Sequence, residues 1–209
     1  MKKKLLAGFV LASMTVAFAG CSMLGGNLSE KKFSEFVTKE LDAEEMDFDD
    51  VKDATDEEDF EDIEDGVYFT ADGKDATFLF DEMIDEVVGS PSKVEKSANY
   101  VRFDMDDEEI VVASLLTFKD EKKIDSFIED AVDLWDEMSE DAKDWAIADE
   151  GETEALAYFD MGYDEEYYCG IYKSGKTALV IVSINDDDTV EDLCKGLKIY
   201  DLSSIKDAD

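Results

Sequence analysis

The chain of 209 residues contains no histidine, one proline and three cysteines. Arg102 is its one arginine. Without histidine, the chain cannot build a Ser-His-Asp or Cys-His catalytic arrangement or a histidine-ligated zinc site. It also lacks the glycine patterns GxxxxGK[ST] and GxGxxG, which hold phosphate groups. These absences exclude several common catalytic and cofactor-binding chemistries.

Acidic residues dominate what is present. The chain has 57 Asp and Glu against 20 Lys and Arg, a net charge of −37. Nucleic-acid binding depends on basic side chains that neutralise phosphates, so this composition excludes it. A basic protein or peptide is the partner that such charge favours, and solubility is the simpler explanation of it. Hydrophobic residues make up 44% of the chain, which predicts a folded domain and not a disordered one.

The first 20 residues have the layout of a signal peptide. Three lysines follow Met1, and the 16 residues from Leu5 to Gly20 are almost all apolar or small. This apolar run is shorter than the roughly 20 residues that a membrane-spanning helix needs. The layout predicts export from the cytoplasm.

The signal peptide ends in Ala17-Phe18-Ala19-Gly20-Cys21, which resembles the lipobox of bacterial lipoproteins. Phe18 stands where that motif usually has leucine. The resemblance implies that the Cys21 thiol receives a diacylglyceryl group, with acyl chains such as palmitate, and that cleavage before Cys21 makes it the new N-terminus. Ala17-Phe18-Ala19 also fits an ordinary signal-peptidase site, and cleavage after Ala19 would release a soluble protein.

The lipoprotein resemblance implies an organisation and a location. Residues 1–20 are the signal peptide, 21–28 the lipidated cysteine with a flexible tether, and 29–209 an acidic domain on the extracytoplasmic face of the cell membrane. The body is similar to small acidic lipoproteins of unknown function in Gram-positive bacteria. Because anionic headgroups repel an acidic protein, we expect the lipid anchor, and not the protein surface, to hold the domain at the membrane.

Hydrophobic periodicity predicts alternating helices and strands in the body. The expected helices cover about 29–45, 80–88, 120–138 and the segment around 190–197. The expected strands cover 67–70, 97–105, 109–118, 154–161, 166–173 and 177–184. The acidic stretch 47–65 is expected to be a long loop. This order predicts a single α+β domain in which amphipathic helices pack on an antiparallel sheet.

Two of the expected strands are apolar on both faces, Ile110–Phe118 and Ala178–Ile184. Strands of this kind lie at the centre of a sheet that is at least partly covered on both sides.

Two cysteines remain if Cys21 is lipidated, Cys169 and Cys194. Outside the cytoplasm they could form a disulfide, provided that the face of the strand carrying Cys169 meets the last helix. The alternative is a pair of buried free thiols.

Carboxylates are the remaining source of chemistry. Asp186, Asp187 and Asp188 follow a strand, and hard cations such as Ca²⁺ prefer several carboxylate oxygens. The segment lacks the glycine and the terminal glutamate of an EF-hand loop, so helix capping by Asp188 is the alternative. No other cofactor is indicated.

Tyrosines gather in the adjacent expected strands 154–161 and 166–173. If Tyr168 and Tyr172 projected from a sheet face free of helices, they could line a surface for a partner. Ordinary packing within the sheet is the alternative.

The sequence therefore favours a membrane-anchored, non-enzymatic binding or assembly module. A calcium-binding or adhesive domain and a carboxylate-dependent hydrolase are the alternatives. The hydrolase would need a pocket that holds two buried carboxylates.

Overall fold

The computed structural model describes residues 28–56, 66–104, 108–149, 154–162 and 165–205. Cys21, the rest of the predicted signal peptide and the tether up to Asn27 lie outside the described residues, as does the segment 57–65. Among the described residues, no helix is both long enough and apolar enough to cross a bilayer.

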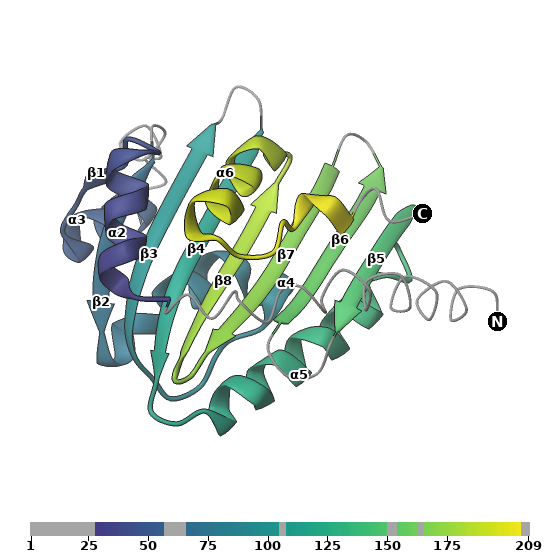
Figure 1. Ribbon diagram of the computed structural model, residues 1–209, viewed down its shortest axis with the longest axis horizontal. Coiled ribbons are helices and arrows are strands. Elements are labelled where there is room, and N and C mark those ends of the chain that lie inside the picture. Colours follow the sequence, from purple (N-terminus) through teal and green to yellow (C-terminus); the bar gives the residue numbers. More distant parts are fainter. Residues whose placement is uncertain (1–27, 57–65, 105–107, 150–153, 163–164, 206–209) are drawn as a thin grey trace.

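One sheet runs through the centre of the fold (Figure 1). In the described part of the chain its strands follow the order β1-β2-β3-β4-β8-β7-β6-β5. Their bounds are β1 Glu44–Glu45, β2 Val67–Asp72, β3 Val94–Asp104, β4 Glu109–Phe118, β5 Asp144–Asp149, β6 Glu154–Gly162, β7 Glu165–Ser174 and β8 Thr177–Ile184. β1 pairs with β2 in parallel, and the other neighbouring strands pair antiparallel. The predicted α+β fold with an antiparallel sheet is confirmed.

Helices cover both faces of the sheet (Figure 1). One face, here called the α5 face, packs against α3 (Phe48–Asp56), the π-helical turn η3 (Phe80–Ile84), α4 (Asp85–Val88) and α5 (Lys122–Met138). The opposite face, called the α6 face, packs against α2 (Glu30–Lys39), α6 (Asp187–Leu197) and the short turn η4 (Ser203–Ile205). The predicted central strands are β4 and β8, and they pair with each other. Their side chains from Val111 to Leu116 and from Ala178 to Ser183 are buried on both faces, as expected.

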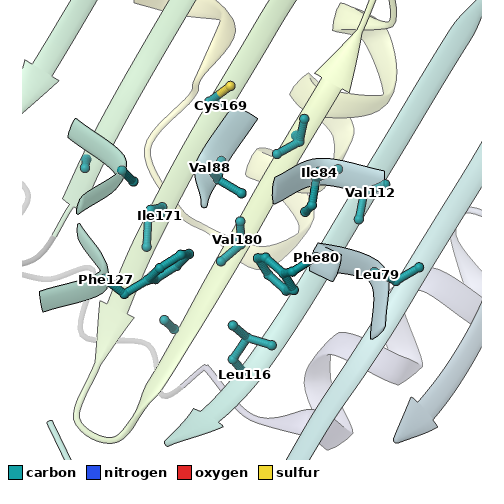
Figure 2. Packing of buried hydrophobic residues seen from close by; sticks show 14 of the residues in the cluster. Leu79, Phe80, Ile84, Val88, Val112, Leu116, Phe127, Cys169, Ile171 and Val180 are labelled. Atoms are coloured by element: carbon teal, nitrogen blue, oxygen red, sulfur yellow. The ribbon is translucent and has the colours of Figure 1, made fainter. Parts of the chain in front are cut away.

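The core of the α5 face is built from aromatic and branched side chains. Figure 2 shows Phe80 and Phe127 lying over Val180 and Leu116 of the sheet. The rings of Phe80 and Phe127 meet edge to face, with centroids 6.0 Å apart, a geometry that aromatic pairs favour. Trp135 is fully buried, and its indole Nε1–H donates to the Val87 carbonyl at 2.8 Å. This bond ties α5 to α4 at the point where α4 ends.

The helices follow the periodicity of the sequence. Ser29 caps α2, where its side chain accepts a hydrogen bond from the Lys32 N–H at 3.4 Å. In α5 the buried residues recur at helical spacing on one side: Ile124, Phe127, Ile128, Ala131 and Trp135. Both helices were predicted, but α2 ends at Lys39 and not near residue 45.

The prediction of a loop over 47–65 is wrong for its first part, because α3 spans Phe48–Asp56. Val51 and Ala54 are buried, and Phe48 packs against Phe69 and Phe78 on the α5 face. Three apolar residues at a spacing of three are enough to hold one side of a short helix on the sheet, while its acidic residues face water. The short strands β1 and β5 were not predicted.

Candidate functional site

The most concentrated group of buried and half-buried charges surrounds Arg102, near the end of β3. Its guanidinium forms ion pairs with Glu109 at 3.2 Å and with Asp104 at 3.5 Å. It also pairs with Asp186, the residue that precedes α6. The Asp186 side chain is only 4% exposed and that of Arg102 is 26% exposed. The group therefore links the β3–β4 hairpin to the start of α6.

The backbone explains why these residues meet. Arg102 follows Tyr100 by two positions on β3, so both side chains project to the α6 face. Asn185 takes a left-handed conformation, with φ of 60°, directly after β8. The next residue, Asp186, then caps α6 by accepting a hydrogen bond from the Thr189 N–H at 2.8 Å. Its own carbonyl accepts a hydrogen bond from the buried Ser183 hydroxyl at 2.8 Å.

The electrostatics of the group favour a charged Arg102. Burial lowers the pKa of the guanidinium, but the carboxylates of Asp186 and Glu109 outweigh this effect and raise the pKa overall. Burial, followed by the nearby charge of Asp186, raises the pKa of Glu109. The guanidinium donors are directed at carboxylates of the chain itself. The geometry therefore suits a clamp that positions α6.

Asp186, Asp187 and Asp188 do not converge on a common point. Asp186 is buried against Arg102, whereas Asp187 and Asp188 are exposed in the first turn of α6. Within the described residues, no group of three or more acidic, cysteine or histidine side chains is placed to hold a metal ion. As the alternative interpretation predicted, an aspartate of this segment caps the last helix, but the capping residue is Asp186 and not Asp188.

Tyr168 and Tyr172 do not form an exposed surface, so that prediction is wrong. They are 0% and 2% exposed, because α6 and the segment that follows it cover their face of the sheet. The Tyr172 hydroxyl donates to the Tyr200 carbonyl at 2.9 Å. The Tyr168 hydroxyl reaches Glu166 at 3.5 Å. Both tyrosines belong to the core, which was the alternative interpretation.

Cys169 and Cys194 are free thiols in the structure. Cys169 lies in the core of the α5 face and Cys194 in the core of the α6 face. The predicted condition for a disulfide fails because the face that carries Cys169 meets α5, while α6 covers the other side (Figure 2 shows Cys169 on the α5 side). Burial raises the pKa of Cys169, which keeps its thiol protonated and unreactive.

Two clefts adjoin the helices. One, of about 300 Å³, is lined mainly by apolar residues of η3, α4, β4 and β8, with Glu82 among its lining residues. The other, of about 230 Å³, lies between α2 and α6, with Glu35 among its lining residues. Neither of these two clefts contains the pair of carboxylates that a glycoside hydrolase requires.

No protein-family model and no curated protein matches the sequence. Among solved structures, the fold is similar to the extracellular domain of PknH from Mycobacterium tuberculosis, with a TM-score of 0.40 and 9% sequence identity. The match covers 63% of this chain and 80% of that domain.

The clamp around Arg102 was not predicted. One feature of the sequence pointed to such a group of ion pairs. The single arginine of a chain with 57 acidic residues is expected to pair with carboxylates. Which carboxylates they are depends on the pairing of β3 with β4 and on the turn at Asn185.

Proposed function

We propose that the chain is an extracytoplasmic lipoprotein, anchored through a lipidated Cys21, whose acidic domain serves as a non-enzymatic binding or assembly module. The observation that carries the proposal is the sequence of the N-terminus. Three lysines are followed by an apolar run, and the run ends in small residues and then a cysteine. Lipoprotein processing acts on this arrangement.

The start of the folded domain supports the proposal. Ser29 caps α2, so the body begins eight positions after Cys21. The six residues between Cys21 and Leu28 reach at most about 20 Å. A tether of this length keeps an independently folded domain close to the bilayer surface. Two acyl chains supply stable anchoring, because each buried methylene contributes about 0.8 kcal/mol.

The surface charge supports a binding role for basic partners. In the described part of the chain, Asp186 is the one charged side chain that is fully buried, and the other described carboxylates are half-buried or exposed. An excess of surface carboxylates attracts basic proteins and peptides over distances of about 8 Å at physiological ionic strength. The calcium-binding and hydrolase alternatives stay predictions.

Mass spectrometry of the N-terminal peptide from the native host tests the anchor. We expect a diacylglyceryl adduct on Cys21, and we expect Cys21→Ser to move the protein from the membrane fraction to the medium or the periplasm. Ser22→Ala is the matched control and should stay membrane-bound. A mature chain that begins at Gly20, or an unmodified thiol at Cys21, would contradict the proposal.

A further inference from the structure

Three loops meet at one end of the sheet, and each carries lysines. The Lys119 N–H donates to the Lys93 carbonyl at 3.1 Å, and the Phe118 N–H donates to the Lys176 carbonyl at 2.8 Å. The Lys176 ammonium also donates to the Lys119 carbonyl at 3.2 Å. These bonds join the start of β3, the loop between β4 and α5, and the β7–β8 turn. The lysines are thus held together by the backbone of the sheet.

Lysines gather at this end of the molecule, although the chain as a whole is strongly acidic. The segments 93–96, 119–125 and 173–176 contain seven lysines and four acidic residues. We call these seven lysines the basal surface. They comprise the exposed Lys93, Lys119, Lys122 and Lys176 and the half-buried Lys96, Lys123 and Lys173.

The opposite end of the sheet has the reverse charge. Asp104, Glu108 and Glu109 flank the β3–β4 turn, and Asp187 and Asp188 begin α6. β3 has 11 residues and is therefore about 35 Å long. This length is about four times the Debye length at physiological ionic strength, which is about 8 Å. A charged surface that touches the basal end is consequently screened from the carboxylates at the far end.

The chain enters the domain beside the basal surface. Glu30, in the first turn of α2, forms an ion pair with Lys96 at 2.9 Å. α2 then runs away from that end of the sheet (Figure 1). Lys31 and Lys32 of the same turn are exposed and add two further positive charges near the point where the tether arrives.

Lys93 occupies a backbone conformation that is unfavourable for its side chain. Its φ is 67°, in the left-handed region where glycine is preferred. Lysine stands at this position although glycine would be less strained, and the position directly precedes β3.

We propose that the basal surface lies against the anionic headgroups of the bilayer that holds Cys21, with the acidic end of the domain directed away from the membrane. The inference depends on the lipid anchor proposed above. It also reverses the expectation from net charge, because screening leaves only the nearest charges in contact with the headgroups, and lysines outnumber carboxylates in the segments that form the basal end.

Lysine footprinting on vesicles tests the orientation. The mature chain is coupled through Cys21 to a maleimide lipid, which is selective because Cys169 and Cys194 are 0% and 1% exposed. Vesicles of phosphatidylcholine, with or without phosphatidylglycerol, are then treated with N-hydroxysuccinimidyl acetate, and each lysine is quantified by mass spectrometry. The reference lysines are the exposed Lys39, Lys52 and Lys143, which lie outside the basal surface.

We expect phosphatidylglycerol to slow the acetylation of Lys93, Lys119 and Lys176 at least threefold relative to the reference lysines. About 1 M salt, which shortens the Debye length to about 3 Å, should remove the difference. Equal rates in both kinds of vesicle, or protection of the reference lysines instead, would overturn the inference. The lipid is attached chemically in this experiment, so its result does not depend on natural lipidation of Cys21. Failure of natural lipidation is detected separately, by the mass of the N-terminal peptide.

A pair of matched triple variants gives a second measurement. Lys93→Gln, Lys119→Gln and Lys176→Gln together should abolish the protection that phosphatidylglycerol confers on Lys122. Lys39→Gln, Lys52→Gln and Lys143→Gln make the same change in net charge and should leave that protection intact. Equal effects of the two triple variants would mean that net charge, and not the basal surface, controls the contact.

Discussion

The two faces of the sheet are both covered by helices, but their cores differ in chemistry. The α5 face is filled mainly by phenylalanine, valine, leucine and isoleucine side chains, with Trp135 beneath α5. The α6 face contains several tyrosines, whose hydroxyls meet carboxylates and carbonyls, and the Arg102 clamp at one end. The α5 face is thus stabilised mainly by packed volume, whereas the α6 face also depends on satisfied polar groups. The sheet also separates the two cysteines, because the Cys169 side chain lies on the α5 face and Cys194 belongs to helix α6 on the opposite face.

The largest effect is expected from removing volume on the α5 face. Phe80→Ala should lower the free energy of unfolding by about 3–5 kcal/mol, because Phe80 is fully buried and its ring contacts Phe127. Urea denaturation measures the change. Phe80→Leu keeps most of the volume and should lose clearly less. A loss below about 1 kcal/mol for Phe80→Ala would show that this core is loosely packed.

Removing the clamp should weaken the α6 face by a smaller amount. Asp186→Ala deletes the cap of α6 and one of the carboxylates around Arg102, and we expect a loss of about 2–3 kcal/mol. Asp188→Ala, in the exposed first turn of the same helix, is the control and should change stability by less than about 0.5 kcal/mol. Equal losses for the two variants would mean that the clamp does not stabilise α6.

A gain in stability is expected at one position of the α5 face. The buried Ser114 hydroxyl lacks a hydrogen-bond partner among the described residues, and its side chain projects to the α5 face. Ser114→Ala removes this unpaired group and should raise the free energy of unfolding by about 1 kcal/mol. Ser183→Ala on the α6 face should instead lower it, because the Ser183 hydroxyl donates to the Asp186 carbonyl. Thermal melts of the two variants should shift in opposite directions.

The smallest effect at neutral pH concerns Tyr100 of the α6 face. Burial raises the pKa of Tyr100 to about 12 from its ordinary value near 10. The folded state therefore holds this proton more tightly, and the resulting stability is complete below pH 10 and is lost as the pH rises toward 12. Tyr100→Phe should be nearly neutral at pH 7 and should shift the midpoint of alkaline unfolding upward, as followed by circular dichroism. An unchanged midpoint would mean that Tyr100 ionises without opposing the fold.

Local patterns predicted much of the fold. Helical periodicity located α5, and its capping serine located the start of α2. Runs apolar on both sides marked β4 and β8 as central strands. The prediction failed over Phe48–Asp56, where the acidic composition masked a helix with a narrow apolar side. Such a helix has little stability of its own and forms because the α5 face receives it.

Site predictions were less successful, because they required knowledge of which face each helix covers. Tyr168 and Tyr172 were correctly assigned to one side of β7, but nothing in a single strand indicates that α6 covers that side. The same gap left open whether Cys169 and Cys194 form a disulfide. Asp186 could not be distinguished from Asp187 and Asp188 until its approach to Arg102 was known.

The sequence by itself predicted an N-terminal export signal, and it determined the acidic composition, the absence of histidine chemistry and the class of fold. Each of these depends on residue types and on short-range periodicity, which a chain carries before it folds. Only the tertiary structure decided the partners of Arg102, the separation of the two buried thiols and the gathering of lysines at one end of the sheet. These features join residues far apart in the chain, and strand pairing is what brings them together.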